Sequence, residues 1–198
     1  AEDGSVISNT EASALIPGTQ WRISSHDATL NGTKLLQSIL GEKRFSFPKS
    51  LYAVHDAIRF FAANKPNALI VDFFAGSGTT LLLNAEDGGH RRCIMVTNNE
   101  VSANEAKSLR AQGFYPDDEE WGKLGIARYV TWPRTVCSIE GHDVNNKPLG
   151  GKYIGSDLPM SDGFKANAAF FKLNFLDKTS VALGRQFKEL LPVLWMKG

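Results

Sequence analysis

The sequence predicts an α/β fold of the doubly wound, Rossmann-like type, in which helices cover a parallel sheet. Two observations predict it. An apolar run over residues 68–71 ends at Asp72 and leads into a glycine-rich turn, 76–78, after which leucines restart an apolar segment. A second apolar run, 93–97, is followed by the carboxylate of Glu100. Acidic residues at the tips of two successive strands are typical of sheets that bind ligands at the carboxyl ends of their strands.

Helices are predicted on either side of these strands. Apolar spacing indicates a helix over about 51–64, a second over about 79–86 and a third over 101–112, and Gly113 is a natural residue to end the third. The predicted unit is therefore β-α-β-α, with an acidic residue at each strand tip.

The glycine-rich turn does not fit the two best-known phosphate-binding loops. A Walker A loop needs glycine where Phe73 stands and lysine where Thr79 stands, and the dinucleotide fingerprint fails at Leu81. A phosphate-binding loop does not need an acidic residue at the position of Asp72. A ligand that carries an amino group would use one. A purely structural β-to-α turn is the alternative interpretation of this fragment.

Glu100 has two interpretations. A carboxylate at the tip of the second strand is placed to accept hydrogen bonds from ribose hydroxyls, and each such charge-assisted bond contributes roughly 1.5–3 kcal/mol when shielded. Alternatively, Glu100 begins the next helix, where a carboxylate favours the N-terminal dipole.

Three segments of the sequence resemble motifs of a known protein family. Residues 72–80, Asp-Phe-Phe-Ala-Gly-Ser-Gly-Thr-Thr, closely resemble the S-adenosylmethionine loop Asp-Pro-Phe-x-Gly-Ser-Gly-Thr-Thr of the DNA amino-methyltransferases, with Phe73 in place of proline. Residues 45–50, Phe-Ser-Phe-Pro-Lys-Ser, look like the family's Phe-x-x-Pro-Lys-Pro/Ser motif, and 96–100 match the position of its acidic ribose motif. These enzymes methylate the exocyclic N6 of adenine or N4 of cytosine.

The order of the motifs is similar to that of the β class of the family, in which the cofactor half is the C-terminal part of the chain. The segments 125–134, 156–164 and 170–177 also resemble the modification subunits of type III restriction systems and related site-specific adenine methylases. The resemblance runs from about Gly32 to the end of the chain. It implies DNA as a partner through the full-length enzyme, and leaves open a homodimer and a restriction-nuclease subunit.

The resemblance also implies a cofactor site for S-adenosyl-L-methionine. Asp72 is expected to face the α-amino group, the glycine loop to wrap the methionine part with residues 48–50, Glu100 to hold the ribose, and Phe73 or Phe74 to pack on adenine. The residues expected at this site are Phe47, Pro48, Lys49, Ser50, Asp72, Phe73, Phe74, Gly76, Ser77, Gly78, Thr79, Thr80, Asn98 and Glu100.

The family's catalytic tetrapeptide, Asp/Asn/Ser-Pro-Pro-Tyr/Phe, does not occur in this sequence, which contains no Pro-Pro pair. In the family its polar side chain and aromatic ring hold the flipped target base. The nearest candidate, Asp157-Leu-Pro-Met160, lacks both the second proline and the aromatic residue. We therefore expect no catalytic residue here, and a chain that is the C-terminal portion of a longer enzyme and is inactive alone.

The expected organisation has three segments. Residues 1–30 form an N-terminal arm severed from a missing upstream region, 31–134 form the cofactor-binding core, and 135–198 form a hairpin and a helix packed on that core. Within them, alternation predicts strands over 127–132 and 135–139 and a hairpin over 135–154. A further strand over 168–176, a turn-like acidic segment over 115–123, and a helix over 180–194 limited by Pro192 complete the prediction, so the C-terminal extension is expected to be β-rich.

Composition narrows the function further. The net charge is +1, so the chain carries no strong electrostatic footprint for DNA. Cys93 and Cys137 lie in apolar runs and are interpreted as buried thiols of a reduced, cytoplasmic protein, and the four histidines show no ligand spacing, so no metal is expected. No run approaches the roughly 18 apolar residues of a membrane span. Two alternatives stay open: a methyltransferase for a non-DNA substrate, and a non-catalytic assembly module.

Overall fold

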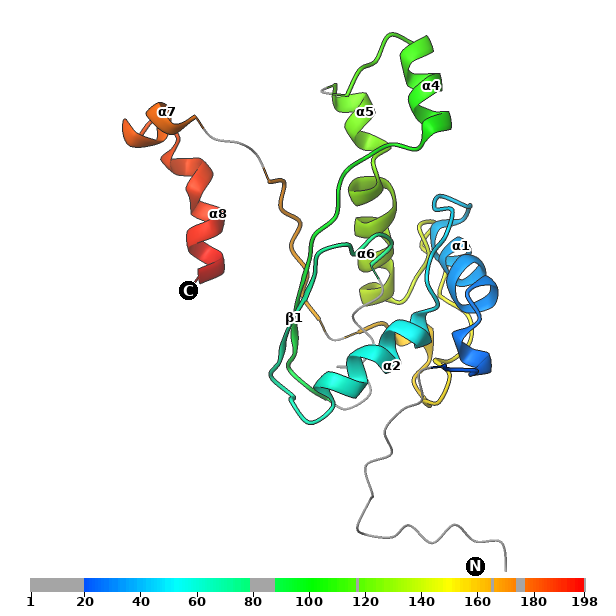
Figure 1. Cartoon of the computed structure of the whole chain (residues 1–198). Coiled ribbons are helices and arrows are strands. Elements are labelled where there is room, and N and C mark those ends of the chain that lie inside the picture. The colour runs from blue at the N-terminus through cyan, green and yellow to red at the C-terminus, as the bar shows by residue number, and fades with distance from the viewer. Residues whose placement is uncertain (1–19, 79–87, 117, 165, 174–176, 198) are drawn as a thin grey trace, which may run out of the picture.

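The computed structural model describes residues 20–78, 88–116, 118–164, 166–173 and 177–197. Figure 1 shows a body in which α1, α2 and α6 lie together, with the strand pair beside them, α4 and α5 beyond one end of α6, and α7 and α8 apart from the body. The elements in chain order are η1 (Ser24–His26), η2 (Thr29–Lys34), α1 (Leu35–Leu40), α2 (Leu51–Ala62), β1 (Leu69–Asp72), β2 (Arg92–Met95), α4 (Ala103–Ala111), α5 (Glu119–Lys123), η3 (Ala127–Thr131), α6 (Trp132–Glu140), η4 (Met160–Asp162), α7 (Lys178–Ala182) and α8 (Phe187–Lys197).

The two predicted strands pair in parallel. Their register runs from Leu69 opposite Arg92 to Asp72 opposite Met95, so both strands end at the same edge. The helices predicted over 51–64 and 101–112 are present as α2 and α4. The helix predicted over 79–86 lies outside the described residues. Helices around a small parallel sheet are compatible with a partial α/β fold, and the doubly wound sheet stays a prediction.

One face of this strand pair is exposed and carries three aliphatic side chains and Arg92. On β1 the side chains of Leu69 and Val71 are 53% and 45% exposed, and on β2 that of Ile94 is 47% exposed, whereas Ile70 and Cys93, which point the other way, are half-buried. Since successive side chains of a strand point to opposite faces, the described residues cover the second face better than the first.

The buried core lies between the helices, not on the sheet. Leu40 is fully buried at the end of α1, Val130 in η3 is 1% exposed, and Tyr52 of α2 is 4% exposed. The Tyr52 hydroxyl also accepts a hydrogen bond of 2.8 Å from the backbone N–H of Ile154, which ties the segment after α6 to α2. The core cluster is made of Leu36, Ile39, Leu40, Leu51, Tyr52, Val130, Cys137, Leu149, Tyr153 and Met160.

The strands predicted over 127–132 and 135–139 are wrong. Both segments are helical, as the π-helical η3 and the α-helix α6. Ala127, Val130, Thr131, Arg134 and Thr135 are all buried, and their spacing of three and four is that of one helix face. Over a few residues the alternation of β-branched and aromatic side chains is typical of a strand. The buried residues at spacings of three and four extend over a longer segment, and their burial favours the helix.

The predicted hairpin over 135–154 is therefore wrong as well. Its first half is α6, which ends at Gly141 with φ +77°, and its second half folds back through isolated antiparallel bridges, His142 with Pro148 and Lys152 with Pro159. Within that second half the chain turns, and the Asp143 carboxylate accepts the backbone N–H groups of Asn145 and Lys147. The C-terminal extension is accordingly helical and irregular, not β-rich.

Three smaller corrections concern the rest of the chain. Residues 119–123 of the turn-like acidic segment form α5, and the described part of the predicted last strand, 168–173, is not a strand. The final predicted helix is two helices, α7 and α8, and α8 continues through Pro192. The division into three segments stays a prediction.

Among the residues that the structure describes, no helix combines the length and the apolar character needed to cross a membrane.

Candidate functional site

The glycine loop begins where β1 ends and is fixed to the end of β2. The backbone N–H of Val96 donates to the Asp72 carbonyl at 2.8 Å, and the N–H of Ala75 donates back to the Val96 carbonyl at 3.1 Å. The N–H of Gly78 then donates to the Ala75 carbonyl at 2.7 Å, which closes a tight turn. These bonds make the loop a rigid continuation of the parallel strand pair.

The two glycines of the loop adopt conformations that favour glycine. Gly76 has φ +49° and Gly78 has φ +71°, both in the left-handed region. A Cβ at Gly76 would lie 3.4 Å from the Phe45 ring, and one at Gly78 would lie 3.1 Å from Cγ2 of Thr131. A loop of this shape brings its backbone close to a ligand, so its geometry fits the cofactor loop that the motif predicts.

The back of the loop is held by η3 and α6. The Thr131 hydroxyl donates to the Gly76 carbonyl, and Arg134 Nη1 donates to the Ser77 carbonyl at 3.0 Å and to the Ser77 hydroxyl at 2.9 Å. Arg134 is 4% exposed, and burial lowers its pKa to about 10, so the guanidinium stays charged at neutral pH. We call Thr131 and Arg134 the loop clamp.

The acidic residue at the strand tip is available to a ligand. Asp72 is half-buried, and its Oδ1 accepts the Phe74 N–H at 3.1 Å, which orients the carboxylate at the start of the loop. The rings of Phe73 and Phe74 are 66% and 94% exposed. Thr79 and Thr80, the last two predicted residues of this loop, lie outside the described residues.

The upstream motif lies against the same loop through its first residue. Besides the contact of Phe45 with Gly76, the motif packs on η2, where a Cβ at Gly32 would lie 2.6 Å from the Pro48 carbonyl oxygen. The predicted residues of this motif differ in their solvent exposure. Pro48 and Ser50 are buried, whereas Phe47 and Lys49 are exposed.

Ser50 is engaged inside the protein. Its hydroxyl donates to the Ser25 carbonyl at 2.8 Å, and its side chain is 2% exposed. This bond fixes the start of α2 to the segment that precedes η2. In the described arrangement Ser50 therefore orders the motif from within.

The second predicted acidic residue lies at the end of the segment that follows β2. Asn98 and Glu100 are both exposed. Asn99 between them is bonded on both sides: its Nδ2 donates to the Gly122 carbonyl at 2.7 Å, and its Oδ1 accepts the Arg128 N–H at 3.2 Å. Glu100 is thus held near α5 and η3, with its carboxylate free to face solvent or a ligand.

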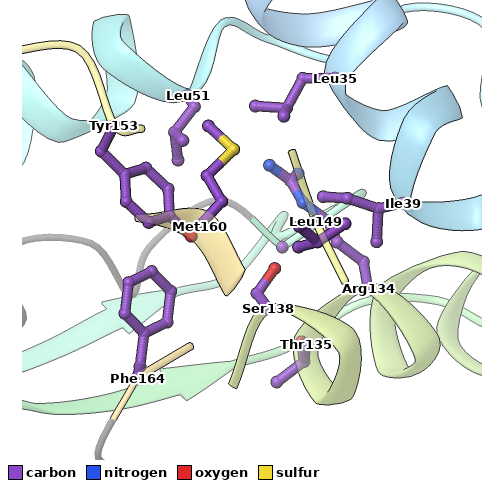
Figure 2. Close-up of a pocket in the computed structure, with 11 residues that line it drawn as sticks. Leu35, Ile39, Leu51, Arg134, Thr135, Ser138, Leu149, Tyr153, Met160 and Phe164 are labelled. Atoms are coloured by element: carbon purple, nitrogen blue, oxygen red, sulfur yellow. The ribbon is translucent and has the colours of Figure 1, made fainter. Parts of the chain in front are cut away.

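A small cavity lies behind the glycine loop. Figure 2 shows its lining, with Arg134 reaching from α6 into the space between apolar side chains of α1 and the segment around Leu149. The cavity volume is about 20 Å³, which is room for about one water molecule and far below the several hundred Å³ of a cofactor pocket. The cavity is therefore part of the packing around Arg134.

A larger cavity of about 430 Å³ lies elsewhere, between α2 and residues 154–156. There the Asp56 carboxylate is 2.8 Å from His26 Nε2 and 3.2 Å from His55 Nδ1. None of the predicted cofactor residues lines this cavity, so its size does not make it the candidate site. Among the described residues, no group of histidine, cysteine and acidic side chains is arranged to hold a metal ion.

Comparison with known proteins agrees with the family resemblance that the motifs indicate. The chain is 44% identical over 85 residues to the type II methyltransferase M.KpnI of Klebsiella pneumoniae, covering 41% of this chain and 20% of that protein. The chain is similar to restriction–modification methyltransferases. It is also 35% identical over 91 residues to the type III restriction-modification enzyme EcoPI Mod subunit of Escherichia phage P1, which covers 44% of this chain and 14% of the subunit.

A third relative matches more of the chain. The type III restriction-modification enzyme StyLTI Mod subunit of Salmonella typhimurium (strain LT2) is 34% identical over 157 residues, covering 77% of this chain and 21% of the subunit. No protein-family model matches. The chain thus spans about a fifth or less of the length of these relatives, and the resemblance predicted from the motifs is confirmed.

The loop clamp was not predicted from the sequence. Thr131 lies in the first predicted strand, 127–132, and Arg134 lies between the two predicted strands, so the prediction did not place the two side chains on one face. The available signal was the position of Pro133, which suits the first turn of a helix. The helical run of η3 and α6 is continuous, and it places Thr131 and Arg134 three residues apart on one face.

Proposed function

We propose that this chain is the S-adenosyl-L-methionine-binding part of a DNA methyltransferase of a restriction–modification system, which transfers a methyl group to N6 of adenine. The observation that supports this most is the glycine loop itself. It follows a parallel strand that ends in Asp72, has left-handed glycines at 76 and 78, and is fixed to the end of the neighbouring strand. The relatives' names, type II methyltransferase and type III Mod subunit, agree with this proposal.

The proposed roles follow the exposure of each group. Asp72 would bind the α-amino group of the cofactor, because its carboxylate lies at the start of the loop. The backbone of 76–78 would surround the methionine part, Glu100 would hold the ribose hydroxyls, and the exposed ring of Phe73 or Phe74 would pack on the adenine.

The cofactor supplies an electrophilic methyl group, and the exocyclic nitrogen of the base attacks it directly. For such a displacement the protein contributes chiefly by positioning. This chain supplies the cofactor side of that arrangement: a charged anchor at Asp72, a rigid loop, and an acid near the ribose. The tetrapeptide that holds the target base is absent from the sequence, so we expect cofactor binding by this chain without methyl transfer.

Calorimetric titration with S-adenosylmethionine and S-adenosylhomocysteine tests the proposal. Wild-type chain should bind saturably, and Asp72→Ala and Glu100→Ala should each weaken binding about tenfold or more, which corresponds to about 1.4 kcal/mol. Glu119→Ala is a matched control, because Glu119 is an exposed acid of α5 whose carboxylate lies 3.4 Å from Lys123 Nζ and far in sequence from the loop. Its binding constant should stay within roughly twofold of the wild type.

Two results would count against this proposal. If the wild-type chain folds cooperatively but binds neither compound, the proposed cofactor site is wrong. Transfer of labelled methyl to unmethylated duplex DNA by this chain alone would show that the missing tetrapeptide is not needed. A competition experiment with duplex DNA on the full-length enzyme separates a DNA substrate from a small molecule or protein.

A second candidate function is assembly, and the aliphatic side chains on the exposed face of β1 and β2 favour it. Three aliphatic side chains, Leu69, Val71 and Ile94, are each about half exposed there, and contiguous apolar surface often marks an interface. Homodimerisation, or docking of a restriction-nuclease subunit on the full-length enzyme, would use such a surface. Light scattering on the purified chain should then show a mass that rises with concentration, and Val71→Lys should abolish the rise.

A further inference from the structure

Two carbonyl groups of the glycine loop point toward the same helical segment. The Gly76 carbonyl accepts from the Thr131 hydroxyl, and the Ser77 carbonyl accepts from Arg134. Thr131 is 7% exposed and Arg134 is 4% exposed, so both bonds are shielded from water. Hydrogen bonds that are shielded from water are stronger than exposed ones. The bond from the Arg134 guanidinium is also charge-assisted.

The direction of these carbonyls fixes the direction of an amide. In a planar trans peptide the C=O and the following N–H point in opposite directions. The N–H of Ser77 shares its peptide with the Gly76 carbonyl, so it points away from Thr131. The N–H of Gly78 is bonded to the Ala75 carbonyl, and none of the loop's hydrogen bonds among the described residues uses the N–H of Ser77.

We propose that Thr131 and Arg134 are positioning residues of the cofactor site, which orient the Ser77 amide toward the bound ligand from behind the loop. This inference rests on the proposed function. The loop clamp touches no ligand itself. It sets the loop's conformation before binding, so that the ordering of the loop is not left to the ligand.

The clamp has a second, electrostatic effect. Arg134 places a full positive charge directly behind the loop, where no bulk water screens it. An oriented amide in front of a buried cation favours an anionic group, so the carboxylate of an amino-acid ligand is the chemistry that this arrangement recognises. The same groups give no help to an uncharged nucleoside.

The chain contains a matched comparison for Arg134. Arg91 is also buried, at 7% exposed, and also donates to backbone carbonyls, with Nε and Nη2 at 3.1 and 2.9 Å from the Ala62 oxygen and Nη2 at 3.0 Å from that of Ala63. It closes the end of α2 and does not contact the glycine loop through these bonds. Replacing Arg91 therefore reproduces the loss of a buried guanidinium that holds backbone carbonyls at the end of α2.

The test combines calorimetry with S-adenosylhomocysteine and amide hydrogen exchange of the ligand-free chain. Thr131→Val, which keeps the shape and removes the hydroxyl, should weaken binding roughly tenfold and speed exchange at Ser77 and Gly78, and Thr131→Ser should restore both. Arg134→Lys should weaken binding several-fold, because an ammonium does not reproduce the fork of a guanidinium. Arg91→Lys should lower the melting temperature and leave the dissociation constant within roughly twofold.

The outcomes separate the two proposals. A folded wild-type chain that does not bind S-adenosylhomocysteine overturns the proposed function and this inference with it. A wild type that binds, together with Thr131→Val and Arg134→Lys variants that bind equally well, overturns only the inference. Equal weakening by Arg91→Lys and Arg134→Lys also overturns it, because the effect would then be one of general stability.

Discussion

A Cβ atom added to Gly78 would lie 3.1 Å from Cγ2 of Thr131. Gly78 also has φ +71°, which costs an ordinary L-residue about 1 kcal/mol or more. Gly78→Ala should therefore lower the free energy of unfolding by about 2–3 kcal/mol, the sum of the backbone strain and of the displacement of Thr131. Urea denaturation of the variant measures this loss.

Gly113→Ala is the control for that experiment. Gly113 has φ +87°, but a Cβ there would meet nothing within 4 Å. Only the backbone strain should remain, at about 1 kcal/mol. Equal losses at both positions would mean that the loop does not press on Thr131 as closely as the distance indicates.

Asn99 should be important for both stability and binding. Its side chain bonds to the Gly122 carbonyl and to the Arg128 N–H, and it immediately precedes Glu100. Asn99→Ala should cost about 1–2 kcal/mol of unfolding free energy and should also weaken cofactor binding, because Glu100 loses its support. Thermal denaturation and calorimetry measure the two effects, and Asn98→Ala, at an exposed neighbour, should leave the melting temperature almost unchanged.

His142 should make stability depend on pH. Its Nδ1 lies 2.8 Å from the Asp143 carbonyl and its Nε2 lies 2.8 Å from a Glu140 carboxylate oxygen. The carbonyl and then the carboxylate raise the pKa of His142 above 6.5. Since the folded pKa is raised, the stabilisation is fully present below about pH 6.5 and is lost as the pH rises through the folded value.

The measurement is the melting temperature of wild type and His142→Gln over the range from about pH 5.5 to 8.5. The difference between them should be largest at the acidic end and shrink toward the basic end. Glu140→Gln should reduce the difference, because it removes the charged partner. A difference that grows with pH would contradict the assignment.

The two cysteines should differ in reactivity. Cys137 is 4% exposed, and burial raises the pKa of its thiol, whereas Cys93 is half-buried in β2. Because the thiolate is the reactive form, iodoacetamide should modify Cys93 well before Cys137 in the native chain. Mass spectrometry of the time course checks this, and in denaturant the two rates should converge.

The elements that could be predicted from the sequence were those with unambiguous local signals. The strand ending at Asp72 is a short β-branched run closed by a glycine turn, and it appears as β1 in parallel with β2. The helix α2 follows from apolar residues at helical spacing, and α4 from similar spacing and from Gly113 after its end. In the structure the Ser102 side chain caps α4 by accepting the Glu105 N–H. In each case propensity and burial favour the same structure.

The segment 127–140 could not be predicted in that way because its propensity and its burial disagree. Its β-branched and aromatic residues favour a strand locally, but tertiary contacts decide the structure. Val130 and Cys137 are buried in the core, while Thr131 and Arg134 bond to the glycine loop. Only a helix presents these four side chains together, and the loop that they contact lies far away in sequence.

The residues of the candidate site also differ in how well the sequence predicted their positions. Asp72, Gly76 and Gly78 were identified from their own motif, and the structure brings the upstream Phe45 against Gly76. Ser50, by contrast, was expected to line the cofactor, and it is buried with its hydroxyl donated to Ser25. A motif specifies which residues occur together, whereas the direction of each side chain depends on the packing around it.

The loop clamp also bears on the order of folding. Thr131 and Arg134 are 55 and 57 positions away from the loop residues that they hold. Closing a chain segment of that length costs conformational entropy before any contact compensates for it. We expect β1, β2 and the local helices to form first, and the glycine loop to acquire its final shape only when α6 docks. A cofactor would then recognise the last part of the protein to be ordered and would slow unfolding more than it speeds folding.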